Sequence, residues 1–174
     1  MRIIEGGLTF GEFDAKNLFH IEKTNIYKNK FSGDGVKSVE FILNRPEENE
    51  LLFVEARTTL PSKCNIAHYN KEIADISKKF LDSLQLAIGI WFGSHNPSVD
   101  APQNKESFFT YGKQIILVLV IKNRTGKLTA ISERIKQEIH REHKLMGLKV
   151  RVWNEELAIK ANLIAQENGE QHND

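Results

Sequence analysis

The chain has 174 residues, of which 40% are hydrophobic and 27% charged, a composition typical of one globular domain with a sizeable core. Its 24 Lys and Arg balance 23 Asp and Glu, which excludes a polybasic nucleic-acid arm or an acidic tail as the organising feature. The single Cys64 excludes an internal disulfide, the first residues lack the apolar segment of a signal peptide, and the longest apolar run, Ile115–Ile121, is too short to span a bilayer. We therefore expect a cytoplasmic protein without a membrane span.

The N-terminal third contains one ambiguous segment followed by a hairpin. Leu18–Ile26 fits either a strand or part of a short helix that begins at Asp14, and we favour the strand. A turn is indicated at Ser32–Gly35. The two apolar segments after this turn, Lys37–Asn44 and Leu51–Thr58, predict a β-hairpin.

A long helix and a long loop occupy the middle of the chain. Apolar residues at spacings of three and four predict a helix between Asn70 and Trp91, ended by Gly93. The following stretch, Gly93–Lys113, is long for a bare loop and is interpreted as a lid or as a plain surface loop. Its aromatic residues indicate that the second half packs against the domain.

The C-terminal part has the periodicity of a βαβ unit. Ile115–Ile121 is continuous and apolar, as expected of a central strand buried on both faces. One helix is predicted from Leu128 to Met146, with Gly147 as its left-handed cap, and Leu148–Trp153 alternates like a half-buried strand. The two strands should be parallel.

A last helix is predicted after Asn154, which should cap it, through about Ala165. We thus expect one α/β domain over residues 1–166 and a flexible polar tail over 167–174. The expected fold is a mixed sheet with an antiparallel N-terminal hairpin, a parallel C-terminal βαβ unit and helices on both faces.

The register of the hairpin can be derived from its turn. If Pro46–Asn49 is a four-residue loop, Arg45 faces Glu50. One face of the hairpin is then wholly apolar, with the facing pairs Val39–Ala56, Phe41–Val54 and Leu43–Leu52. The other face has the pairs Ile42–Phe53, Glu40–Glu55 and Ser38–Arg57.

This register places the carboxylates of Glu40 and Glu55 directly across from each other, where they repel. A divalent cation such as Mg²⁺ would compensate them, because it takes oxygen ligands from one or two carboxylates. Arg57 is the structural alternative, since its guanidinium could neutralise both in an ion-pair cluster. Lys79 could also approach this end if the long helix covers the hairpin.

These residues resemble the PD-(D/E)XK nuclease-like superfamily, which has the restriction-endonuclease-like fold. The resemblance rests on Glu40, the hairpin, Val54–Thr58, the long helix and the buried strand, and covers roughly half of the chain. It implies that Glu40 and Glu55 ligate Mg²⁺, that the metal activates a water for phosphodiester hydrolysis, and that Arg57 holds the scissile phosphate.

The sequence departs from the family pattern at three points. Arg57 replaces the lysine of the pattern, and a guanidinium does not release its proton at neutral pH. Ser38 and Val39 precede the first acidic position, where the family has proline. The acid of a leading helix would come from Glu12 or Glu22.

Two functions from different classes follow. The first is a divergent metal-dependent nuclease-like protein that acts on nucleic acid, with a site that is either active or inactive. The alternative is a non-enzymatic interaction or regulatory protein, a homodimeric accessory subunit, in which Arg57 is a structural ion-pair partner.

Basic residues form a further cluster in the C-terminal part, interpreted either as phosphate contacts or as ordinary solvated surface. Its members are Lys122, Arg124, Lys127, Arg141, Lys144, Lys149 and Arg151.

Overall fold

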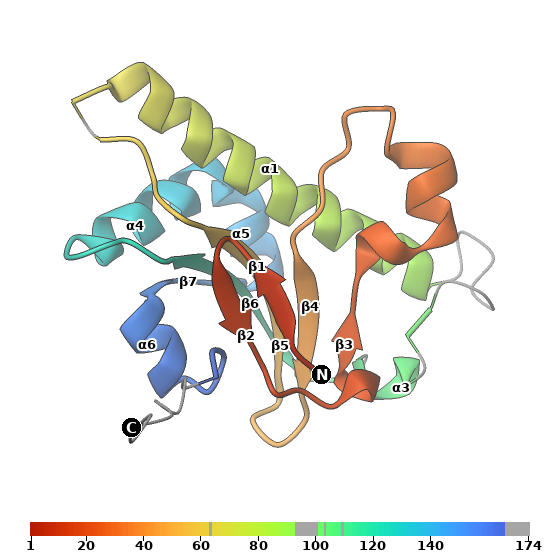
Figure 1. Cartoon of the computed structure of the whole chain (residues 1–174). Helices are drawn as coiled ribbons and strands as arrows, with labels where there is room; N and C mark the ends of the chain where they lie inside the picture. The colour runs from red at the N-terminus through yellow and green to blue at the C-terminus, as the bar shows by residue number, and fades with distance from the viewer. Residues whose placement is uncertain (63, 93–100, 103, 109, 166–174) are drawn as a thin grey trace, which may run out of the picture.

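A five-stranded mixed sheet forms the centre of the molecule in the computed structural model (Figure 1). The structure describes residues 1–62, 64–92, 101–102, 104–108 and 110–165. In spatial order the strands are β3 (Leu18–Phe19), β4 (Phe41–Arg45), β5 (Glu50–Arg57), β6 (Gln114–Ile121) and β7 (Lys149–Asn154). Strands β3, β4 and β5 are antiparallel neighbours, whereas β5, β6 and β7 are parallel. The predicted α/β class, with an antiparallel hairpin and a parallel C-terminal unit, is confirmed.

The β4–β5 hairpin has the predicted register, from Phe41 opposite Val54 to Arg45 opposite Glu50. The alternation of side chains sends neighbouring residues to two different cores. Phe53 belongs to the core beneath the long helix, and Phe41 and Val54 belong to the core on the opposite face. The turn and the alternation of apolar residues therefore sufficed to predict which face each ladder residue occupies.

Strand β4 is shorter than predicted, because its ladder with β5 begins at Phe41. Glu40 lies directly before the ladder, and its N–H donates to the Val54 carbonyl at 3.0 Å. The predicted facing pairs Ser38–Arg57, Val39–Ala56 and Glu40–Glu55 are therefore not part of the ladder. Val39 consequently packs in the core beneath the long helix rather than beside Phe41.

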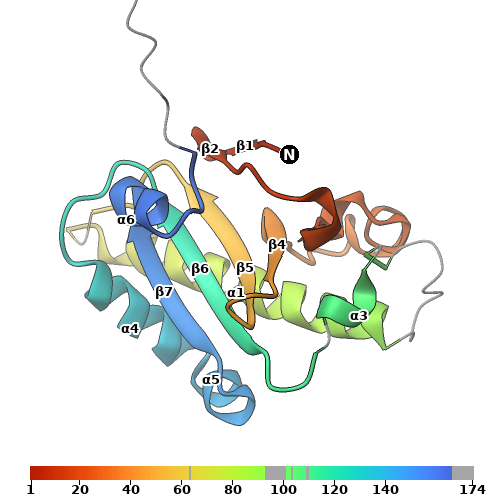
Figure 2. The same ribbon diagram turned by 90° about the horizontal axis from the view of Figure 1, so that it is seen from below.

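One face of the sheet is covered by α1 (Ile66–Trp91) and α4 (Leu128–Glu138), and the two views place both helices on the same side (Figures 1 and 2). Helix α1 confirms the helix predicted between Asn70 and Trp91 but begins earlier, at Ile66. The side chain of Asn65 caps it by accepting the N–H of His68 at 3.3 Å. The predicted stop at Gly93 lies outside the described residues.

The opposite face is covered by a two-stranded hairpin, β1 (Ile3–Glu5) and β2 (Leu8–Phe10), and by α6 (Glu155–Lys160), which Figure 2 shows on the far side of the sheet from α1. The turn of the hairpin, Gly6 and Gly7, has positive φ at both residues, as a tight two-residue hairpin turn requires. Gly6 packs directly on β5, where an added Cβ would lie 3.0 Å from the Ala56 Cβ.

The central strand β6 is fully buried along Ile116–Ile121, as predicted. The single helix predicted after it is divided at Ile139 into α4 and α5 (His140–Met146), because the φ and ψ of Ile139, −106° and 27°, are not helical. Gly147 is the predicted left-handed cap, with φ of 60°. Helix α6 ends at Lys160, earlier than predicted.

The strand predicted over Leu18–Ile26 is largely wrong. Only β3 is extended, and short helical turns surround it: Ala15–Asn17, Ile21–Lys23 and the π-helical segment Tyr27–Phe31. Apolar side chains such as Ile21 and Ile26 are buried from these turns, so their spacing reflects packing rather than strand alternation.

The long loop after α1 is described only in part. Its short helix α3 (Lys105–Phe108) buries Phe108 against the ring of Trp91, with centroids 5.9 Å apart, which confirms that the second half packs against the domain. Tyr111 is fully exposed. The first half of this loop and the predicted tail over 167–174 lie outside the described residues. None of the helices in the described part of the chain is both long and apolar enough to cross a membrane.

Candidate active site

A buried carboxylate, that of Glu55, is the centre of the charged cluster near the end of β5. Its side chain is 0% exposed and points to the α1 face of the sheet. Lys79, on α1, donates to both carboxylate oxygens, with Nζ 2.9 Å from Oε1 and 3.1 Å from Oε2. The helix therefore covers this end of the hairpin, as the sequence suggested for Lys79.

Glu40 and Glu55, the two predicted carboxylates, converge on the same ammonium group. The Oε1 atom of Glu40 lies 3.5 Å from Lys79 Nζ. The structure thus brings the two predicted carboxylates together. The Lys79 ammonium lies between them, where the sequence predicted it only on the condition that the long helix covers the hairpin.

Arg57 also binds Glu55, through an ion pair of its Nη1 with Oε1. Its Nε donates to Glu72 Oε1 of α1 at 2.8 Å, and Nη1 donates to the Ala56 carbonyl at 3.2 Å. The Arg57 guanidinium is therefore held by three partners. This is the ion-pair cluster that the sequence indicated as the structural alternative to a metal site.

Burial raises the pKa of Glu55 to about 7, and the charge of Glu40 adds to this rise, while Lys79 and Arg57 oppose it. Burial lowers the pKa of Lys79, but the carboxylates of Glu55 and Glu40 outweigh it and the net pKa is raised. Near neutral pH, Glu55 is consequently the group in this cluster that exchanges a proton.

Side chains of α1 fix the segment that carries Glu40. The Val39 N–H donates to Ser83 Oγ at 2.8 Å, and the Lys37 N–H donates to Asp82 Oδ2 at 2.8 Å. Ser83 is fully buried, so its hydroxyl is a fixed acceptor. The same helix therefore positions Glu40 from one side and supplies Lys79 from the next turn.

A pocket of about 270 Å³ opens beside Glu40. Two further carboxylates line it, Glu5 from the end of β1 and Glu22 from the helical turn after β3. Burial raises the pKa of both groups, and the negative charge of Glu40 raises each of them further. Three carboxylates, two of them with raised pKa values, thus line one cavity together with the basic residues Arg2 and Lys23, and perturbed carboxylates of this kind are frequent at functional sites.

His20 lines the same pocket, and its Nδ1 donates to the Glu40 carbonyl at 3.2 Å. Burial lowers its pKa, and Lys23 lowers it further, so the ring is neutral at pH 7. Of the two acids proposed for a leading helix, Glu22 belongs to this pocket. Glu12 instead forms an exposed ion pair with Arg2.

The donor set fits a hard divalent cation rather than a structural zinc. Over the described part of the chain, no group of three or more His, Cys, Asp and Glu side chains is arranged to hold a metal. Two converging carboxylates are enough for Mg²⁺, which keeps waters and substrate oxygens as its other ligands. Glu40 and Glu55 could therefore hold such an ion beside the Lys79 ammonium that both now contact.

The basic cluster predicted in the C-terminal part is divided by the topology. Lys122 follows the end of β6, whereas Lys149 begins β7. Because β6 and β7 are parallel, these residues lie at opposite ends of the sheet. They do not form one phosphate-binding surface.

No family model, curated protein or solved structure matches this chain.

Proposed function

We propose that the protein is a metal-dependent nuclease-like phosphodiesterase, in which Glu40 and Glu55 bind Mg²⁺ and Lys79 replaces the lysine that is absent at position 57. The observation that carries this proposal is the convergence of both carboxylates on the Lys79 ammonium. The order of hairpin, long helix and parallel strand agrees with the resemblance to the PD-(D/E)XK superfamily.

Residual negative charge supports a cation at this place. The coupled groups comprise five carboxylates, Glu5, Glu22, Glu40, Glu55 and Glu72, and three cations, Lys23, Arg57 and Lys79. A divalent ion would neutralise this excess, and the pocket beside Glu40 leaves space for water and a phosphate group.

Each residue has a distinct task in this proposal. When bound, the metal lowers the pKa of a coordinated water. Lys79, whose pKa is raised by the neighbouring carboxylates, stays protonated and balances the charge of Glu55. Arg57 stays protonated and, held by Glu72, stabilises the negative charge that develops on the phosphate.

A second candidate is the non-enzymatic interaction protein. The full burial of Glu55 and its contacts with both Lys79 and Arg57 favour it, because a charge-balanced cluster of this kind needs no metal. The two candidates differ in whether the cluster binds a divalent cation.

Metal titration by calorimetry tests the proposal, with Mg²⁺ and Mn²⁺ added to the original protein and to E40Q and E55Q. We expect binding by the original protein and a loss of at least about tenfold in affinity in each variant, because each removes one charged ligand. E47Q, in the exposed hairpin turn, is the matched control and should bind like the original.

Cleavage is then measured on single- and double-stranded DNA and on RNA, with and without the metal. Metal-dependent cleavage that K79M abolishes supports the assigned role of Lys79. If neither ion binds to the folded original protein, the nuclease proposal is wrong and the structural candidate remains.

A further inference from the structure

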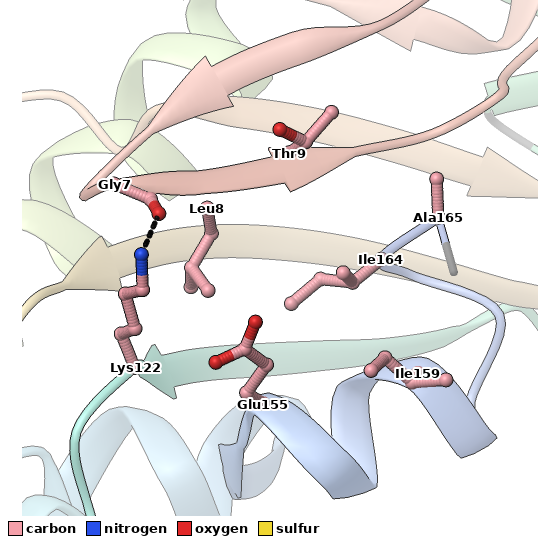
Figure 3. Close-up of a pocket in the computed structure, with 8 residues that line it drawn as sticks. All are labelled: Gly7, Leu8, Thr9, Lys122, Glu155, Ile159, Ile164 and Ala165. Carbon is pink, nitrogen blue, oxygen red and sulfur yellow. Dashed lines mark hydrogen bonds between the residues drawn. The ribbon is translucent and has the colours of Figure 1, made fainter. Parts of the chain in front are cut away.

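A second pocket, of about 440 Å³, lies on the other side of the β1–β2 hairpin from the carboxylates of the candidate active site. Three segments that are distant in the sequence form it: the hairpin, the residue after β6, and α6 with the chain that follows (Figure 3). It opens at the carboxyl end of β6, the end of a parallel sheet at which open α/β folds bind ligands. Its volume is that of a small-molecule site.

The walls of this pocket are fixed by contacts of the backbone. Phe10 and Ile164 form a β-bridge, and the Ala165 N–H donates to the Thr9 carbonyl at 3.3 Å. The turn is held by Thr58, the residue after β5, whose hydroxyl donates to the Gly6 carbonyl at 3.2 Å. The cavity is therefore formed before any ligand arrives, which reduces the entropy lost on binding.

Two opposite charges face the pocket without neutralising each other. Lys122 Nζ donates to the Gly7 carbonyl at 2.6 Å, and an ammonium has two further N–H groups. Figure 3 shows the Glu155 carboxylate pointing into the space between Leu8 and Ile164. Among the residues that the structure describes, Glu155 has no ion-pair partner.

Besides the two charged residues, Thr9 and three large aliphatic residues line the pocket. Leu8 and Ile164 are almost completely buried and form the floor together with Ile159. A ligand that fits has an aliphatic body beside its charged groups.

The pair of charges decides the ligand class. A simple anion would be attracted by Lys122 but repelled by Glu155. A simple cation would be attracted by Glu155 but repelled by Lys122. A ligand that carries both charges satisfies both side chains with charge-assisted hydrogen bonds. The geometry points to a small zwitterion of the amino-acid type, whose ammonium pairs with Glu155, whose carboxylate pairs with Lys122, and whose aliphatic side chain lies on the apolar floor.

L-leucine is the probe, titrated into the full chain and followed by NMR chemical shifts. We expect saturable shifts, with an affinity at least about tenfold weaker in E155Q and in K122M, since each loses one charge-assisted hydrogen bond. E156Q is the matched control, because Glu156 is a neighbour on the same helix that pairs with Lys160 at 2.5 Å, and it should bind like the original.

Two fragments of the probe separate a zwitterion site from a simple ion site. Isoamylamine lacks the carboxylate and 4-methylpentanoate lacks the amine, and both should bind at least about tenfold more weakly than L-leucine. The inference is overturned if L-leucine fails to bind, if either fragment binds equally well, or if both variants bind L-leucine like the original. The inference does not depend on the nuclease proposal, because none of the residues that act in that proposal lines this pocket.

Discussion

Strand β5 has a carboxylate near each end, and the two have different surroundings. Glu50, its first residue, forms a two-pronged ion pair with Arg151 of β7, with Nη2 2.9 Å from Oε1 and Nη1 3.4 Å from Oε2. Both side chains keep some contact with solvent, 16% for Glu50 and 33% for Arg151. Glu55 is 0% exposed, binds two cations and has the carboxylate of Glu40 beside it.

The comparison separates a structural ion pair from an assembled site. At the Glu50 end one carboxylate meets one guanidinium, and the charges balance. At the Glu55 end the five coupled carboxylates outnumber the three cations, a surplus that raises carboxylate pKa values and that a further bound cation would relieve. Variants of the two ends test this difference.

The largest effect is expected from K79M, which removes the ammonium and keeps most of the apolar stem. Glu55 is then left buried beside Glu40, and breaking a buried pair in this way costs about 3–5 kcal/mol of the free energy of unfolding. Urea denaturation at pH 8 in metal-free buffer measures it. R151M, at the other end of the strand, should cost only about 1 kcal/mol. Equal losses in the two variants would contradict the distinction between the ends.

The second effect is the part of the pH dependence of stability that comes from Glu55. Its pKa rises from 4.5 to about 7 on folding, so the native state binds the proton more tightly than the unfolded chain does. The stability from this group is complete below pH 4.5 and is lost as the pH rises through about 7, by up to about 3 kcal/mol.

The measurement is the free energy of unfolding of the original protein and of E55Q at several pH values, in buffer with a chelator. The difference between the two should change steadily across this window, and E50Q should show no such slope relative to the original. If the free energies of unfolding of the original protein and of E55Q change in parallel with pH, Glu55 does not titrate in this pH window.

The smallest expected effect is on the positioning of Glu40. S83A removes the acceptor of the buried Val39 N–H and should cost about 1–3 kcal/mol. It should also weaken Mg²⁺ binding, because Glu40 follows Val39 directly. S132A is the control: Ser132 donates to the Val150 carbonyl at 3.0 Å, remote from the carboxylates, so its loss should lower stability but leave metal affinity unchanged. A weakened affinity in both variants would assign the effect to general destabilisation.

The sequence predicted the part of the candidate site that local rules determine. The turn at Pro46–Asn49 and the apolar alternation were enough to predict that Glu40 and Glu55 lie close together, although Glu40 lies just before the ladder rather than in it. Lys79 was predicted only conditionally, since its position depends on which face of the sheet α1 covers. The division of a predicted helix at Ile139 is likewise a matter of packing rather than of spacing.

Glu5 and His20 were not predicted as site residues. Glu5 reaches the pocket because the β1–β2 hairpin packs across the end of β5, a contact between segments about 50 residues apart in the chain. The glycine pair between two short apolar segments was a signal for this hairpin, but no local pattern shows where a hairpin docks. His20 falls in the segment whose secondary structure was predicted as strand.

The β1–β2 hairpin has a consequence for both cavities. Its first strand borders the pocket beside Glu40 and its second strand borders the pocket that contains Lys122 and Glu155, while Gly6 packs the turn on Ala56. The hairpin is thus a wall that the two pockets share, and a movement of the hairpin that widens one pocket alters the shape of the other.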